Sequence, residues 1–389
     1  MTTAGPTKYI GSYVEVCATY LNPDERAMLI RRSSFVRDVA MFCPYGSYIE
    51  VIGQVQRPIM KPSAPTASLF EHLRLPLIVA PMFLVSSVEL VNAACANGAI
   101  GVLPSLNART PEILDEWISR IAAARDARLS AGQPCAPWAV NLVAHTSNQR
   151  LQPDLEICVR HKAPLVITAL GGPRAVVEAV HGYGGLVFAD VNTPEYARKA
   201  AASGVDGLVL VCSGAGGHTG PMAAPPFVSA VREFFDGYIV VGGGLCDGTS
   251  LRAVQAMGAD FGYMGTRFIA TEESHAVPAY KQMVVDSGFA DIVCTNAITG
   301  AWANKLRPSL VAAGLDPDNL KPRDRFDLSN REQDAKAWKD LWSAGHGVGQ
   351  VHAVESTASV IDRLRAEYRQ AVARLSDDRW SNGARAGQL

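Results

Sequence analysis

The sequence predicts an α/β fold built as a (β/α)8 TIM barrel, with a helical insertion after strand 8 and an N-terminal extension. Two observations carry this prediction. From about residue 77, short apolar runs alternate with longer amphipathic segments, and the eight short runs match the strand count of such a barrel. Glycine-rich segments follow the seventh and eighth runs, where barrels often bind phosphate. A doubly wound open sheet is the alternative, and both observations favour the barrel.

The strands are predicted from continuous apolar runs that turn residues bound on both sides, the pattern of strands buried on both faces. Valine, isoleucine and leucine dominate these runs, and branched side chains suit extended backbone. In chain order, the predicted strands are Leu77–Ala80, Ile100–Leu103, Ala139–Val143, Leu165–Ala169, Leu186–Asp190, Gly207–Val211, Ile239–Val241 and Phe261–Met264.

The segments between the strands predict helices, because their apolar residues recur at helical spacing. Capping residues support several of them: Thr193 precedes Pro194 at one predicted start, and Gly204 follows one predicted end. The predicted helices are Ser87–Asn97, Pro111–Leu129, Pro153–Lys162, Arg174–His181, Pro194–Ser203, Pro225–Phe235, Thr249–Met257 and, closing the outer ring, Val351–Leu375.

Two regions lie outside this rhythm. Residues 64–271 and 346–389 are assigned to the barrel, and residues 1–63 form an extension that ends in a proline-rich stretch. Residues 272–345 are more polar, and helical patterns at both ends predict a helical insertion domain. Within the extension the sequence predicts a helix at Pro23–Ala40 and a strand at Tyr48–Val55.

Charge and cysteine content limit the classes of function. The 36 Lys and Arg residues nearly cancel the 37 Asp and Glu residues, so no electrostatic argument favours nucleic acid or an anionic membrane. Eight cysteines without a CxxC pair predict free thiols and no metal site. No signal-peptide core and no run of about 18 apolar residues occurs, so we expect a soluble cytoplasmic protein. Its expected partner is a small-molecule substrate, and a homo-oligomer is compatible with the sequence.

The glycines after strands 7 and 8 predict a phosphate site. Gly242, Gly243 and Gly244 follow strand 7, and Gly265 and Thr266 follow strand 8. Backbone N–H groups and a threonine hydroxyl at these strand ends can cradle a phosphate. The alternative is that these glycines only form tight turns.

Two other strand ends suit a flat ring. Ala80, Pro81 and Met82 follow strand 1 and form a short apolar surface, although the proline alone would also explain the end of the strand. Asn141 lies inside the apolar run of strand 3, and its carboxamide offers a donor and an acceptor to a ring. The alternative is that Asn141 holds a neighbouring loop.

The sixth strand leads into a glycine-rich loop, Gly214-Ala-Gly-Gly-His-Thr-Gly220, in which His218 is a candidate base. The loop allows backbone to approach a ligand closely, and imidazole accepts protons near neutral pH. A complete GxGxxG is absent, so a dinucleotide turn is rejected. A purely structural histidine remains the alternative.

These segments together resemble the nitronate monooxygenases, formerly called 2-nitropropane dioxygenases, which are FMN-dependent TIM barrels with a helical insertion. The resemblance covers about residues 70–370. The matching segments are Ala80-Pro-Met82, Asn141, Gly214–Gly220, Gly242–Gly248, Tyr263–Ser274, Ile298–Gly300 and Ser343–Gly349. The resemblance implies FMN contacts from Ala80, Pro81, Met82 and Asn141 at the ring, Gly216 and Gly217 beside it, and Gly243, Gly244, Gly265 and Thr266 at the phosphate.

By the same resemblance, His218 matches the catalytic base. It would remove the α-proton of a nitroalkane, the flavin would take electrons from the resulting nitronate, and O2 would complete the conversion to a carbonyl compound and nitrite. Because only neutral imidazole accepts a proton, activity on the neutral nitroalkane should rise with pH.

One residue departs from the family pattern near the C-terminus. His346 stands where the family usually has glutamine, on the expected substrate side, which affects substrate choice. Relatives with the same barrel reduce enoyl thioesters or quinones with NAD(P)H. Such a flavin reductase is the alternative function.

Overall fold

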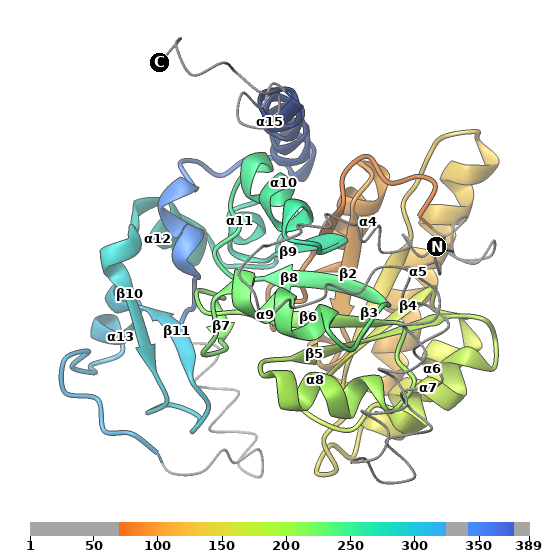
Figure 1. The fold of residues 1–389 in the computed structure, drawn as a ribbon, viewed down its shortest axis with the longest axis horizontal. Coiled ribbons are helices and arrows are strands. Elements are labelled where there is room, and N and C mark those ends of the chain that lie inside the picture. Colours follow the sequence, from red (N-terminus) through yellow and green to blue (C-terminus); the bar gives the residue numbers. More distant parts are fainter. Residues whose placement is uncertain (1–69, 324–340, 377–389) are drawn as a thin grey trace, which may run out of the picture. The chain divides into compact units, whose positions relative to one another are not determined.

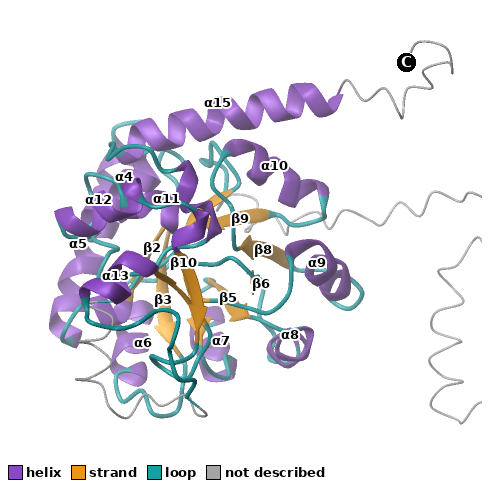
Figure 2. Ribbon diagram, turned by 90° about the vertical axis from the view of Figure 1, so that its left-hand side faces the viewer, coloured by secondary structure: helices purple, strands orange, loops and turns teal. Residues whose placement is uncertain are grey.

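The computed structural model describes residues 70–323 and 341–376, and in these the predicted barrel is present. Eight parallel strands close in the order β1-β2-β3-β4-β5-β6-β8-β9, with helices around them (Figures 1 and 2). Each of the eight predicted barrel strands is confirmed to within one residue at each end. The strands are β1 (Leu77–Val79), β2 (Ile100–Pro104), β3 (Trp138–Val143), β4 (Leu165–Ala169), β5 (Leu186–Val191), β6 (Gly207–Val211), β8 (Tyr238–Gly242) and β9 (Phe261–Met264).

Alternate strand residues fill the barrel interior. Ile78, Ile167 and Val209 are among these inward side chains, and all three are fully buried. Large and small residues complement each other: a Cβ atom placed on Gly207 would lie 2.5 Å from Cδ1 of Phe188. The glycine therefore makes room for the aromatic ring, and the lower barrel is a packed core without a channel.

The eight helices predicted around the barrel are confirmed, with shifted ends. Ser87 and Thr193 cap α4 and α8 by accepting backbone N–H groups, as their positions in the sequence predict. The last helix packs against α10 and α4 and begins only at Thr357, six residues after the predicted start at Val351 and beyond the 3-10 turn η3 at residues 346–350. The helices around the barrel are α4 (Val88–Ala96), η1 (Ser105–Asn107), α5 (Pro111–Ser130), α6 (Leu151–Arg160), α7 (Arg174–His181), α8 (Pro194–Ala201), α9 (Ala224–Arg232), α10 (Gly248–Ala256), α11 (Thr266–Ile269), η3 (His346–Gln350) and α15 (Thr357–Ser376).

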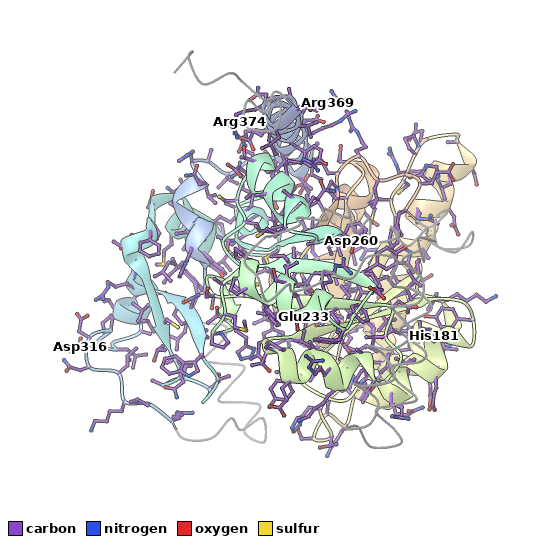
Figure 3. The ribbon with its side chains drawn as sticks, viewed as in Figure 1. His181, Glu233, Asp260, Asp316, Arg369 and Arg374 are labelled. Carbon is purple, nitrogen blue, oxygen red and sulfur yellow. The ribbon has the colours of Figure 1, made fainter. Side chains whose placement is uncertain are left out.

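Two aspartates hold the amino ends of neighbouring strands. Oδ2 of Asp260 accepts the backbone N–H of Ile239 at 2.7 Å, and Oδ2 of Asp206 accepts that of Val187 at 2.8 Å. His181 Nε2 lies 2.9 Å from the same oxygen of Asp206; His181 and Asp260 are labelled in Figure 3. These contacts stabilise the face of the barrel opposite the expected site.

Residues 272–345 are not helical throughout. Two strands of this region form an antiparallel hairpin, and a two-residue strand from the loop after β6 extends it to the sheet β10-β11-β7. The β-branched residues of Ile292–Thr295 favour a strand there, and the edge of β11 pairs with the loop containing His218. The elements are β7 (Gly217–His218), α12 (Pro278–Asp286), η2 (Phe289–Asp291), β10 (Ile292–Thr295), β11 (Ala303–Leu306) and α13 (Arg307–Ala312).

Several predictions fall on residues that the structure does not describe. These are the extension 1–63 with its helix at Pro23–Ala40 and strand at Tyr48–Val55, part of the second helical pattern of the insertion, and residues 377–389. The domain boundaries therefore stay predictions.

Candidate functional site

The barrel interior becomes polar and small at its carboxyl end. On the alternate strands β1, β3, β5 and β8, one layer of inward positions near this end consists of Ala80, Asn141, Asp190 and Gly242. Ala80, Asn141 and Asp190 are partly exposed, whereas the inward residues two positions earlier on their strands are buried. The barrel is thus closed by packing below this layer and open above it.

Three of the predicted ring contacts are held by hydrogen bonds to neighbouring strands or the segments that follow them. The backbone N–H of Ala80 donates to the carbonyl oxygen of Met264 at 2.9 Å. Asn107, after β2, donates from Nδ2 to the carbonyl oxygen of Met82 at 3.1 Å. Asn141 donates from Nδ2 to the carbonyl oxygen of Ile167 at 3.1 Å, which fixes the carboxamide at the barrel mouth.

Asp190 and Tyr263 add two buried polar atoms to this end of the barrel. Neither Oδ1 of Asp190 nor the hydroxyl of Tyr263 has a hydrogen-bond partner among the described residues. Burial raises the pKa of Asp190 to about 7. Burial first and the charge of Asp190 second raise the pKa of Tyr263 well above its ordinary value. At neutral pH a large share of Asp190 is therefore the neutral acid.

The glycine loops after β8 and β9 present backbone donors. Gly243 and Gly244 have positive φ angles of 131° and 72°, which only glycine adopts easily, and a Cβ on Gly244 would meet open space. A phosphate would satisfy donors of this kind, so the loops fit the predicted phosphate group.

The loop containing Gly214, Gly216 and His218, here called the GGH loop, passes very close to the segment before η3. A Cβ atom placed on Gly216 would lie 2.7 Å from the backbone nitrogen of Gly345 and 3.1 Å from Oγ1 of Thr266. The carbonyl oxygen of Gly214 accepts the N–H groups of Gly244 and His346 at 3.2 and 2.9 Å. The predicted site segments therefore meet at this loop.

Two residues of the insertion hold the GGH loop from the other side. Nδ2 of Asn304 donates to the carbonyl oxygen of Ala215 at 2.8 Å, and the N–H of Thr219 donates to the carbonyl oxygen of Trp302 at 3.0 Å. The insertion thereby sets the position of His218 relative to the barrel.

His218 lies beside a buried lysine. In the sheet His218 faces Ala303, and Lys305 two residues further along β11 lies on the same face. Lys305 is fully buried, and its Nζ donates to the carbonyl oxygen of Leu341 at 3.1 Å. Burial lowers the pKa of Lys305 to about 7. Burial first and the charge of Lys305 second lower the pKa of His218 to about 4, so its imidazole is neutral at physiological pH.

His346 is exposed at the start of η3. Its ring packs edge-on against Phe289 with the ring centroids 5.1 Å apart, and a Cβ atom on Gly214 would lie 2.8 Å from its Nδ1. Within the described residues, His346 contacts Gly214 and Phe289. Its predicted role toward the substrate stays a prediction.

The sequence did not reveal Asp190, Tyr263, Asn304 or Lys305 as site residues. Asp190 at the end of an apolar strand carried a usable signal, because a carboxylate in such a run must lie at an opening or find a partner. Nothing in the sequence around Lys305 indicated a role, because its neighbours along the chain do not show that its side chain is buried in the folded protein.

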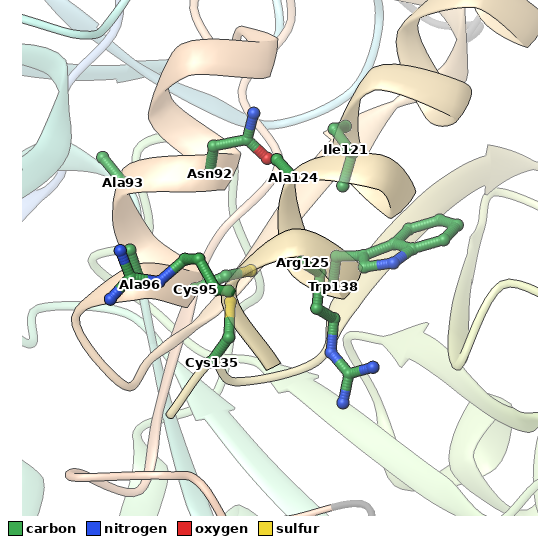
Figure 4. Close-up of a pocket in the computed structure, with 10 residues that line it drawn as sticks. Asn92, Ala93, Cys95, Ala96, Ile121, Ala124, Arg125, Cys135 and Trp138 are labelled. Atoms are coloured by element: carbon green, nitrogen blue, oxygen red, sulfur yellow. The ribbon is translucent and has the colours of Figure 1, made fainter. Parts of the chain in front are cut away.

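A cavity of about 300 Å³ lies away from this site, between α4 and α5 (Figure 4). Cys95, Arg125, Cys135 and Trp138 are among its lining residues, and none of the predicted site residues is. In the described part of the chain, no cluster of three or more His, Cys, Asp or Glu side chains could hold a metal ion. No helix there is long and apolar enough to cross a membrane.

Residues 67–340 match the family described as nitronate monooxygenase. This chain belongs to that family. The match covers the barrel strands, the GGH loop and most of the insertion, so the resemblance inferred from the motifs is confirmed.

Known family members and neighbours extend this result. A nitronate monooxygenase from Paraburkholderia phytofirmans is 24% identical, over 77% of this chain and 94% of its own. The (3aS,4S,5R,7aS)-5-hydroxy-7a-methyl-1-oxo-octahydro-1H-indene-4-carboxyl-CoA dehydrogenase of Mycobacterium tuberculosis is 28% identical, over 61% of this chain and 64% of its own. This chain thus spans about two thirds of the length of the first curated relatives it matches. The structure of FabK from Thermotoga maritima shares the fold, with a TM-score of 0.66 and 22% identity over 80% of this chain and 97% of that one.

Replacing Gly216 tests the close approach at the GGH loop. Gly216→Ala places a methyl group against the backbone of Gly345, and we expect the free energy of unfolding to fall by about 1–3 kcal/mol. Gly172→Ala is the matched control, because a Cβ atom there would meet no atom within 4 Å. Urea unfolding measures both variants; equal stability of the two would contradict the packing described.

Proposed function

We propose that this protein is an FMN-dependent oxidoreductase that converts a nitronate or nitroalkane with O2 to a carbonyl compound and nitrite. The observation that carries the proposal is the convergence of two glycine loops and the GGH loop above a partly open barrel mouth. Membership of the nitronate monooxygenase family supports it.

The cofactor assignment follows from the fit of the donors. The N–H groups of Gly243 and Gly265, with Gly244 and Thr266 beside them, would hold the phosphate. Ala80, Pro81, Met82, Asn141, Gly216 and Gly217 would surround the ring. When bound, FMN would accept electrons from the substrate and pass them to O2.

His218 would act on the substrate through neutral imidazole. Because its pKa lies near 4, it is ready to accept a proton at neutral pH, yet a base of such low pKa provides little driving force. A pre-formed nitronate needs no deprotonation. We therefore propose that nitronates are better substrates than neutral nitroalkanes.

Lys305 would assist as a positioning residue. When protonated it places positive charge near His218, which disfavours the imidazolium form and favours an anionic substrate. Its hydrogen bond to Leu341 ties this charge to the segment that leads to Gly345 and His346.

A second candidate is a flavin enzyme that oxidises or reduces an acyl thioester of coenzyme A. It includes the NAD(P)H-dependent reduction of an enoyl thioester, the alternative function given by the sequence. The specific observation in its favour is the 28% identity to the carboxyl-CoA dehydrogenase of Mycobacterium tuberculosis. A carbon next to a thioester carbonyl is acidic for the same reason as a carbon next to a nitro group, so His218 would suit either substrate. Rapid anaerobic bleaching of the flavin by NADH would favour the reductase.

The phosphate site is tested at Gly265. A Cβ atom there lies 3.4 Å from Sδ of Met82, an ordinary contact, so Gly265→Ala should keep its flavin. Gly265→Val adds two methyl groups at the same place and should yield mostly apoprotein. Acid release and chromatography identify the cofactor; FAD as the sole flavin, or full FMN content in the valine variant, would contradict the assignment.

The role of His218 is tested with two substrates. His218→Asn should lower kcat/KM for a neutral nitroalkane by roughly 10²–10⁴-fold, the usual effect of removing a positioned base, and affect a pre-formed nitronate much less. FMN content and the melting temperature serve as controls for folding. Equal losses on both substrates would indicate binding or anion stabilisation instead of proton removal.

The pH dependence follows from the lowered pKa of His218. The rise of kcat/KM with pH that protonation of His218 causes should lie near pH 4, so titration of His218 should contribute no change in activity on neutral nitroalkane between pH 6 and 8. Lys305→Met removes a neighbouring charge and should move the acid limb to higher pH. The surface variant Lys199→Met is the control. An acid limb unchanged by Lys305→Met would exclude electrostatic coupling to His218.

A further inference from the structure

The inward layer near the carboxyl end of the barrel has an unusual composition. It contains two small residues, Ala80 and Gly242, and two polar ones, Asn141 and Asp190, whereas branched apolar residues dominate the layers below. The small residues leave space that a side chain of the layer beneath fills. A Cβ atom on Gly242 would lie 3.1 Å from Cδ1 of Tyr263. The Tyr263 ring therefore occupies the place that a side chain at position 242 would take.

Two polar atoms in this place are left unsatisfied. Oδ1 of Asp190 and the hydroxyl oxygen of Tyr263 are buried, and no described residue hydrogen-bonds to either. They come from β5 and β9, and Tyr263 is close enough for the charge of Asp190 to act on its phenol. A buried polar atom without a partner is destabilising, and two at the same end of the barrel point to a polar group that is supplied from outside the protein.

We propose that Asp190 and Tyr263 bind a polar edge of the flavin ring from within the barrel, beside Asn141. This inference rests on the proposed FMN site, and it assigns to Asp190 and Tyr263 a role that the motifs do not contain. A neutral carboxylic acid can donate a hydrogen bond to a ring nitrogen or oxygen, and a phenol can donate or accept one. A water molecule bridging the two side chains is the competing occupant.

The proposal has a consequence for the reduction potential of the flavin. A carboxylate beside the ring opposes the negative charge that reduction adds, whereas the protonated acid does not. Burial raises the pKa of Asp190 to about 7, so the acid form dominates at pH 5.5 and the carboxylate at pH 8.5. Tyr263 is the titratable group for which the structure records an electrostatic interaction with Asp190, and its own raised pKa keeps it neutral over this range.

The test compares Asp190→Asn and Tyr263→Phe with the wild type. Asparagine preserves shape and a donor but cannot ionise, so the flavin midpoint potential of Asp190→Asn should equal that of the wild type at pH 5.5 and exceed it at pH 8.5. Tyr263→Phe removes one hydrogen bond and should weaken FMN binding by about tenfold. Thr168→Val is the control: Thr168 is buried in the same barrel and donates to the Phe188 carbonyl oxygen. Thr168→Val should change the melting temperature and leave FMN binding and the midpoint potential unchanged.

These measurements distinguish flavin binding from a bridging water molecule, and none of them depends on catalytic activity. If the variants change the melting temperature of the apoprotein but leave the FMN dissociation constant and both potentials unchanged, a bridging water is the occupant and the proposal is overturned. If the wild type binds no FMN, the proposed function itself fails. If the wild type binds FMN and both variants have the same FMN dissociation constant and midpoint potentials as the wild type, only the roles of Asp190 and Tyr263 are rejected.

Discussion

The site depends on a backbone crossing with no room for side chains. Gly216 of the GGH loop and Gly345 before η3 approach so closely that a Cβ atom on either would overlap the other segment. Thr266 accepts the N–H of Gly345 at 2.8 Å, which brings the loop after β9 to the same point. Because glycine is needed for this approach, the barrel, the insertion and the returning chain can share one site.

The titratable groups of the site share a second property, which is removal from water. Burial shifts the pKa of Asp190 upward and the pKa values of His218 and Lys305 downward, in each case toward the neutral form. A site of this kind carries little fixed charge at neutral pH. A charged substrate or a reduced cofactor would then be the strongest local charge, and groups with pKa values near neutrality would respond to it.

The insertion has a direct part in the site. Its strand β11 (Ala303–Leu306) pairs with the loop that contains His218, and Asn304 and Lys305 of that strand reach the loop from its two faces. The helical pattern predicted for residues 272–345 did not indicate this. Strand pairing between segments about 85 residues apart depends on contacts that no local pattern contains.

The sequence by itself determined the barrel strands, most helix starts and the glycines at the strand ends. These are local properties: an apolar run, a capping residue and a required backbone angle are visible in neighbouring residues. Tertiary structure alone decided which polar residues share the barrel mouth. Asp190 and Tyr263 come to the same end of the barrel because the barrel closes and staggers its strands, and Lys305 lies beside His218 because β11 pairs with β7. The pKa values follow from that burial, and so does the chemistry proposed for this site.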